Sequence, residues 1–152
     1  KELADKQKEV MRDDIIAIAN DVIGSLSKEE QIIVLDEIKV NTGNKITPTA
    51  VVRLKINGKE KIGKGTGVGP VDAVNHAIRS AVGPSISLKE YSLKAITGGT
   101  DALAEVTIKV EDKNKNIFGA AAVDEDVIMA STKALIKGIN KALNFKKQKS
   151  EG

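Results

Sequence analysis

The sequence has 152 residues, 41% hydrophobic and 30% charged, a composition typical of one globular domain or of two small units that share a core. Its 24 Lys and Arg residues against 21 Asp and Glu residues give a net charge of +3, which favours solubility over a polyanion partner, and no apolar run approaches the ~18 residues of a membrane helix. No cysteine is present, which excludes disulfides and thiolate metal sites and fits a reducing, cytoplasmic compartment.

An amphipathic helix is predicted from about residue 5 to residue 23, with Gly24 as its stop. Its apolar residues at helical spacing are Ile15, Ile18, Val22 and Leu26. The next boundary stays open, because Ser27 and Glu30 have the spacing of a capping box whereas residues 31–35 are typical of a strand. The charged start gives no sign of a signal peptide, and since the first residue is not Met, we expect a piece of a longer chain.

Three strands and a helix follow. The strands are predicted around residues 38–40, from about 49 to 56, and up to about 64. Asn57-Gly58 is a strong signal for a two-residue hairpin turn between the last two strands. Pro70 suits the first turn of a helix, since its missing N–H would lack a partner there anyway, and Gly83 is expected to end that helix.

A second unit repeats this order. Its strands and helix are predicted at residues 87–97, 102–111, 117–122 and 125–144. Apolar residues of the two middle strands match at an offset of 54, which becomes 56 where Gly63 matches Gly119. We therefore predict an α+β fold of two pseudo-symmetric βββα units, about 31–83 and 87–144, with antiparallel sheets, helices on one side, and a frayed basic tail at 146–152. Such a repeat creates a groove between its copies, which is typical of a ligand-binding module.

Glycines cluster before the helix that begins near Pro70. Residues 58–65 almost spell a phosphate-binding P-loop, but Gly65 stands where the motif needs Ser or Thr to bind magnesium, which disfavours a nucleotide site. The glycines from Gly63 to Gly69, with Gly67 and Gly69 nearest the helix, leave two interpretations open. They make a tight turn with positive φ angles, or they form a backbone cradle that lets a small anion reach the N–H groups of the helix start.

The titratable residues give no catalytic or metal site. His76 is the single histidine, and one imidazole without a cysteine makes neither a usual zinc site nor a Ser/His/Asp triad that can be argued. It lies off the apolar stripe, so a solvated helix surface is expected. The carboxylates from Asp124 to Asp126 either favour a helix start through its dipole or receive a ligand ammonium group.

The element order also fits a double-stranded RNA-binding module. That alternative is disfavoured because carboxylates stand where such modules present Lys to phosphate. One Tyr and two Phe residues are also too few for a base-stacking platform, so we expect no nucleic-acid partner.

Three segments together resemble the C-terminal regulatory domain of 2-isopropylmalate synthases and of the related citramalate synthases. They are Gly67 to Ala73 (GVGPVDA), Leu88 to Tyr91 (LKEY) and Thr97 to Val106 (TGGTDALAEV). The resemblance covers about residues 35–143, so residues 31–145 are expected to form the regulatory domain. Residues 1–30 resemble the linker subdomain that joins this domain to the catalytic barrel.

The resemblance implies a fragment that is not catalytic by itself and holds no cofactor or metal. The family's parent enzyme is an acyltransferase that condenses acetyl-CoA with a 2-oxo acid in a metal-dependent barrel, whose histidine motif is absent here. In the family, two such domains form a homodimer, and a branched-chain amino acid bound near the pairing surface inhibits the distant active site. The implied effector is leucine, or isoleucine for a citramalate synthase.

The resemblance also implies effector-binding residues by position. They are Val71, Asp72, Leu88, Tyr91, Ala95, Ala102, Val123, Asp124 and Glu125, with Gly67 and Gly69 as the backbone cradle. Val68 replaces the usual Asn, and Ala121 stands where a second glycine is common. N–H groups at Val71 and after Asp124 are expected to bind the ligand carboxylate, and Asp72 or Asp124 to bind its ammonium group.

The spacing of Leu88, Tyr91 and Ala95 predicts an irregular strand. On a regular strand Leu88 would face away from the other two residues, because side chains alternate between faces. A bulge near Glu90 would bring Leu88 and Tyr91 onto one face, so we predict an irregularity between these residues, with the Tyr91 ring against the effector's side chain.

Overall fold

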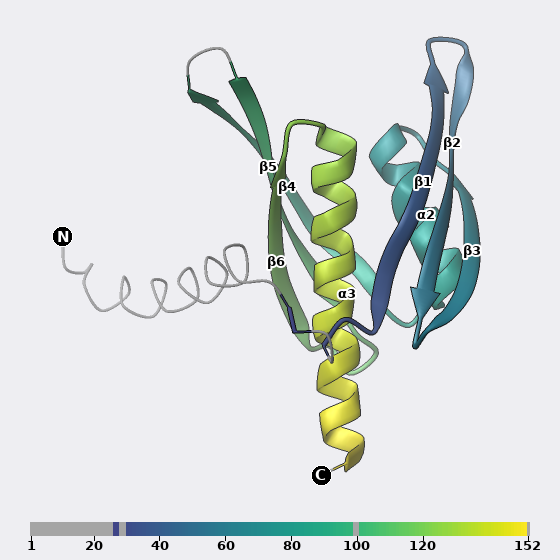
Figure 1. The fold of residues 1–152 in the computed structure, drawn as a ribbon, viewed down its shortest axis with the longest axis vertical. Coiled ribbons are helices and arrows are strands. Elements are labelled where there is room, and N and C mark those ends of the chain that lie inside the picture. The colour runs from purple at the N-terminus through teal and green to yellow at the C-terminus, as the bar shows by residue number, and fades with distance from the viewer. Residues whose placement is uncertain (1–25, 28–29, 99–100, 152) are drawn as a thin grey trace, which may run out of the picture.

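The computed structural model describes residues 26–27, 30–98 and 101–151, and the helix predicted for residues 5–23 lies outside them. Two βββα units follow one another along the chain (Figure 1). Their elements are β1 (Ile33–Gly43), β2 (Ile46–Ile56), β3 (Lys59–Thr66), α2 (Pro70–Val82), β4 (Ser87–Gly98), β5 (Asp101–Glu111), β6 (Ile117–Asp124) and α3 (Val127–Glu151). Neither helix of this described part combines the length and the apolar character that a membrane crossing needs.

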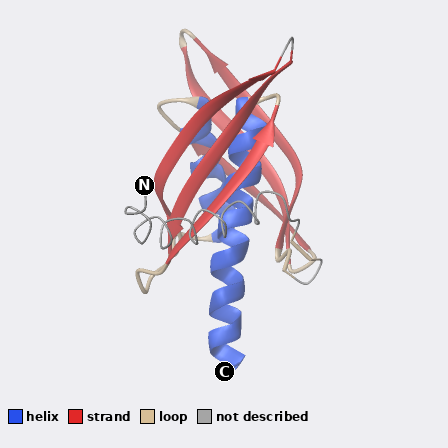
Figure 2. Ribbon diagram, turned by 90° about the vertical axis from the view of Figure 1, so that its left-hand side faces the viewer, coloured by secondary structure: helices blue, strands red, loops and turns tan. Residues whose placement is uncertain are grey.

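The strands form two antiparallel sheets, ordered β1-β2-β3 and β4-β5-β6. Helix α2 packs on β2 and β3, helix α3 packs on β5 and β6, and the two helices contact each other. Both helices therefore lie between the two sheets, as Figure 1 and Figure 2 show from two directions. The predicted α+β architecture, with antiparallel sheets that each carry a helix on one side, is confirmed.

Local signals place the turns as predicted, the open boundary after Ser27 leads into a strand, and the C-terminal end differs from the prediction. Asn57 and Gly58 both have positive φ angles, 53° and 81°, as a tight hairpin between β2 and β3 requires. Ser27 and Glu30 exchange the two capping-box hydrogen bonds, at 3.0 and 3.3 Å, but the chain then enters β1 rather than a helix. At the other end α3 continues through the basic residues 146–149, where the sequence predicts a frayed tail.

The core is formed by the sheet faces that look toward the helices. Alternate residues of the middle strands are buried there, as period-2 patterning requires. Those of β2 are Ala50, Val52 and Leu54, and those of β5 are Ala104, Val106, Ile108 and Val110. Opposite them, Ala and Ile or Leu residues of α2 and α3 fill the layer between the sheets.

The glycines of β3 allow close packing of α2, which corrects the turn interpretation. A Cβ atom on Gly63 would lie 2.0 Å from the Ala77 carbonyl oxygen, and one on Gly65 would lie 2.4 Å from the Ala77 nitrogen. In the described part of the chain positive φ is confined, among glycines, to Gly58 and Gly83. The helix backbone rests directly on the strand, so these positions exclude any side chain.

The internal repeat is real, but its predicted alignment is shifted. A bulge interrupts β1 between Leu35 and Glu37 and β4 between Leu88 and Glu90, which marks one position in both units. When the two units are aligned at these bulges, the buried Val52 of β2 corresponds to Ile108 of β5. Their strand partners, Gly63 on β3 and Ala120 on β6, then also correspond. The predicted match of Gly63 with Gly119 is wrong by one residue, which would place the two on opposite faces.

Candidate functional site

The structure divides the predicted effector residues between two helix starts and one edge strand. Gly67, Gly69, Val71 and Asp72 surround the start of α2, and Val123, Asp124 and Glu125 lead into α3. Both helices begin at the same end of the molecule (Figure 1). Leu88, Tyr91 and Ala95 lie on β4, and Ala102 lies at the start of β5, opposite Thr97.

The predicted irregularity in β4 is confirmed. Leu88 pairs with Val110 and Tyr91 pairs with Ile108, with a register shift between Leu88 and Glu90. Since Val110 and Ile108 are both buried toward α3, Leu88 and Tyr91 face the helix side together. The bulge therefore changes the odd spacing of these two residues into a shared face.

Much of this face of β4 is uncovered. We call Leu88, Tyr91, Leu93 and Ala95 the open β4 face, because Tyr91 is 37% exposed and Leu93 is 49% exposed. The Tyr91 hydroxyl lies 2.7 Å from the hydroxyl oxygen of Ser131 on α3, which fixes the ring direction. An apolar strip of this kind, with a fixed aromatic ring, suits the side chain of a small aliphatic ligand or of a partner.

The start of α2 has no side-chain cap. Its N-cap residue is Gly69, in extended conformation, and no side chain accepts a hydrogen bond from the first turn. The Asp72 carboxylate instead accepts from the Val68 N–H at 2.9 Å. Gly67 makes room for this arrangement, because a Cβ atom there would lie 2.5 Å from the Ala73 nitrogen. The N–H groups of Val71 and Asp72 therefore lack a side-chain acceptor and suit an anion.

The start of α3 supplies its own anions. Asp126 accepts from the N–H groups of Ile128 at 2.7 Å and Met129 at 3.4 Å. Asp124 accepts from the Lys133 ammonium at 2.7 Å, and this hydrogen bond, with that from the Asp126 N–H, lowers the pKa of the Asp124 carboxyl. Glu125 is exposed. Of the two predicted anion sites, the one at α2 therefore keeps first-turn N–H groups that no described side chain caps, although the Asp72 carboxylate lies beside it.

His76 lies on the α2 surface, half-exposed, and also contacts β3. Its Nδ1 lies 2.6 Å from the Thr66 carbonyl oxygen, and its Nε2 lies 3.6 Å from an Asp72 carboxylate oxygen. Within the described ranges, no group of three or more His, Cys, Asp or Glu side chains has an arrangement that could hold a metal ion.

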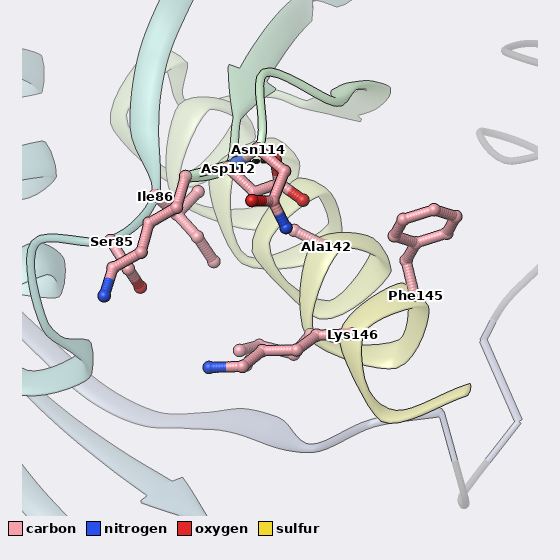
Figure 3. A pocket seen from close by; sticks show the side chains of 9 residues that line it. Ser85, Ile86, Asp112, Asn114, Ala142, Phe145 and Lys146 are labelled. Atoms are coloured by element: carbon pink, nitrogen blue, oxygen red, sulfur yellow. Dashed lines mark hydrogen bonds between the residues drawn. The ribbon is translucent and has the colours of Figure 1, made fainter. Parts of the chain in front are cut away.

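A separate cavity of about 430 Å³ lies beside the second half of α3 (Figure 3). It is lined by Ser85, Ile86, Asp112, Lys113, Asn114, Ala142, Leu143, Phe145 and Lys146. None of the predicted effector residues contributes to it. No sequence signal marked this cavity, because three segments far apart in the chain form its walls.

Comparison with known proteins gives one family and several close relatives. The model of the LeuA allosteric (dimerisation) domain matches residues 9–143. A probable 2-isopropylmalate synthase of Methanopyrus kandleri is 51% identical over 144 residues, which are 93% of this chain and 29% of that protein. The 2-isopropylmalate synthase of Methanocaldococcus jannaschii is 50% identical over 143 residues, 94% of this chain and 27% of that protein.

Citramalate synthases are also similar. The putative (R)-citramalate synthase CimA of Methanothermobacter thermautotrophicus is 43% identical over 154 residues, covering 100% of this chain and 30% of that protein. The chain thus spans less than a third of the length of these curated relatives.

Proposed function

Because the chain belongs to the LeuA allosteric (dimerisation) domain family, we propose that it is the regulatory domain of a 2-isopropylmalate synthase and binds leucine as a homodimer. In this proposal, leucine inhibits the condensation of acetyl-CoA with a 2-oxo acid in the catalytic barrel of a longer parent chain. Inhibition requires leucine to bind two states of that assembly with different affinity.

The observation that carries the proposal is the uncapped start of α2. A leucine zwitterion needs an anion site, a cation site and an apolar surface. The free N–H groups of Val71 and Asp72 suit the carboxylate, and the Asp72 carboxylate, which is half-exposed, suits the ammonium group. Asp124 suits that role less well, since Lys133 already pairs with it. The open β4 face, with Ala102 nearby on β5, supplies the apolar surface.

Calorimetry with leucine, isoleucine and valine tests the proposal, with two matched carboxylate variants. We expect leucine to bind with the highest affinity. Asp72→Asn should weaken it at least tenfold, about 1.4 kcal/mol, whereas Asp124→Asn should leave the affinity unchanged. Absence of binding by all three amino acids to the folded chain would refute the effector proposal. Loss of affinity in Asp124→Asn but not in Asp72→Asn would move the ammonium site to the start of α3.

An isoleucine-binding domain of a citramalate synthase is the second candidate. The similarity to the Methanothermobacter thermautotrophicus relative favours it, although at lower identity than the 2-isopropylmalate synthases. One methyl or branch position changes pocket affinity by only about 1–3 kcal/mol, so the same calorimetric series separates the two effectors. Tighter binding of isoleucine than of leucine would select this candidate.

A further inference from the structure

Each sheet has two edge strands, and helix side chains cover the outer edge of β3 and of β6. On β3, His76 contacts the Thr66 carbonyl oxygen and the Ser80 hydroxyl accepts from the Lys64 N–H at 3.3 Å. On β6, the ammonium of Lys137 donates to the Ala121 carbonyl at 3.3 Å, and Lys141 donates to the Gly119 carbonyl. These contacts occupy backbone groups that would otherwise be available to another strand.

The first residue of β1, Ile33, is held by α3. The Asn140 side chain, 1% exposed, accepts from the Ile33 N–H at 2.8 Å and donates to the Ile33 carbonyl at 2.9 Å. The amide thus pairs with the strand as a neighbouring peptide would. One turn later, Asn144 donates to the Glu30 carbonyl just before the strand.

The outer edge of β4 has no such cover. Within residues 26–27, 30–98 and 101–151, the backbone of β4 pairs with β5 alone. Its side chains form ion pairs across to β5, Lys89 with Glu111 and Glu90 with Lys109, both at 3.4 Å, and the Tyr91 hydroxyl contacts Ser131 on α3. None of these contacts covers the outer edge. Alternate N–H and C=O groups of an edge strand point outward, unpaired, and they template pairing with another strand. On this strand the exposed edge continues directly into the apolar open β4 face.

We propose that β4 pairs antiparallel with β4 of a second copy, about a twofold axis at Ser92, and joins two sheets into one of six strands. This rests on the homodimer proposed above, and it assigns the surface and the register. In this register the Glu90 carboxylate lies opposite the partner's Lys94, and Tyr91 lies opposite the partner's Leu93. Opposite charges and aromatic–aliphatic pairs are the stabilising cross-strand combinations.

The neighbouring registers lack this self-complementarity. A twofold axis at Glu90 or at Lys94 places two like charges directly opposite each other, which is destabilising. An axis at Leu93 places Glu90 opposite the apolar Ile96 of the partner. A register shifted by one residue on one strand places the open β4 face of one chain on the same side of the joined sheet as the polar face of the other.

The pairing would complete the effector site from two chains. The open β4 faces of both copies then form one continuous apolar floor, with Tyr91 of each chain close to the twofold axis. Leucine bound on this floor would contact the dimer surface directly, so that ligand affinity and dimer affinity change together.

Single cysteines test the register, because the chain has none of its own. Ser92→Cys should form an intermolecular disulfide under mild oxidation, since its copies face each other at the axis. There are two controls. Lys94→Cys would cross-link if the twofold axis lay at Lys94, and Lys64→Cys lies on the covered edge of β3. We expect at least ~10-fold more cross-linked dimer for Ser92→Cys than for either control, because a disulfide needs Cβ atoms within about 4.5 Å.

Sedimentation and leucine calorimetry on each reduced variant separate the possible failures. Faster cross-linking of Lys94→Cys refutes the Ser92 register. A dimer in sedimentation in which neither β4 variant cross-links refutes the β4 surface, and so does a monomer. If leucine still binds in these cases, the effector proposal stands and the β4 proposal fails. If Ser92→Cys cross-links efficiently but leucine does not bind, the β4 proposal stands and the effector proposal fails.

Discussion

The two βββα units share one topology, yet each leaves a different part of it uncovered. In the first unit, Asn140 of α3 holds the first residue of β1, while α2 begins without a side-chain cap. In the second unit, Asp126 caps α3, while β4 keeps a free edge and an exposed apolar face. In the proposed effector site, the first copy of the duplicated scaffold thus supplies the anion site and the second copy supplies the apolar surface.

The two units also differ in which element lacks a side chain where the helix packs on its sheet. Close contact between a helix and the sheet beneath it requires a missing side chain. In the first unit the strand supplies it, with Gly63 beneath Ala81. In the second unit the helix supplies it, because a Cβ atom on Gly138 would lie 2.7 Å from Ile108, while the strand carries Ala120.

The largest effect should come from adding a side chain at Gly63, where the strand leaves room for the helix. Gly63→Ala places a methyl group 2.0 Å from the Ala77 carbonyl oxygen, so we expect the free energy of unfolding to fall by about 3 kcal/mol. The matched change in the other unit, Ala120→Gly, removes a buried methyl and should cost about 1 kcal/mol. Urea denaturation of both variants measures the difference. Equal losses would show that the two units tolerate side chains alike.

The second effect concerns the strand that is covered. Asn140→Leu leaves the buried N–H and C=O groups of Ile33 without partners, so the free energy of unfolding should fall by about 2 kcal/mol. Asn144→Leu, one turn away, removes a hydrogen bond to Glu30 at an exposed site and should cost about 0.5 kcal/mol. A thermal melt of each protein compares them. A neutral Asn140→Leu would mean that packing alone holds β1.

The third effect concerns the strand that is open. Tyr91→Ala should weaken leucine binding at least tenfold, about 1.4 kcal/mol, and leave the dimer folded. Its counterpart on β1 is Ile38, which pairs with Val52 as Tyr91 pairs with Ile108. Ile38→Ala should therefore lower stability without changing affinity. Calorimetry with circular dichroism checks both, and loss of folding with unchanged affinity in the remaining native Tyr91→Ala protein would assign the ring to the core.

The smallest effect is a pH dependence in the second unit. Burial lowers the pKa of Lys141 from 10.5 to about 8, and it lowers the pKa of Lys137 in the same direction. Between pH 8 and 10.5 the unfolded chain therefore binds more protons at Lys141 than the folded chain, so stability rises with pH. Since solvent screens this half-buried group, the rise should stay below about 1 kcal/mol.

Lys141→Met provides the matching measurement. Denaturation of the variant and of the original protein across this pH window should show a smaller rise in the variant, which keeps Lys137. A rise of the same size in both proteins would assign it to other groups. In the first unit the position that corresponds to Lys137 is Ser80, so the matching edge contact there is made by a hydroxyl and not by an ammonium group.

Short-range patterns predicted most of the fold. Period-2 apolar alternation located the strands, Asn57-Gly58 located a hairpin, and Pro70 located a helix start, because each depends on the residues of its own segment. Even the bulge in β4 was predicted, from the spacing of Leu88, Tyr91 and Ala95 together with the pocket-lining role that the family resemblance implied for them. The alignment of the two units was not, because the position of each bulge within its pair decides the register.

The sequence by itself determined the element order, the duplication and the residue types of the candidate site. Tertiary structure alone decided which of these remain accessible. Asn140 binds the first residue of β1 from 107 positions away, and Lys133 of the next helix pairs with Asp124. The glycines of β3 leave room for the backbone of α2. No local pattern contains such contacts, because their partners meet only when the two sheets close around the helices.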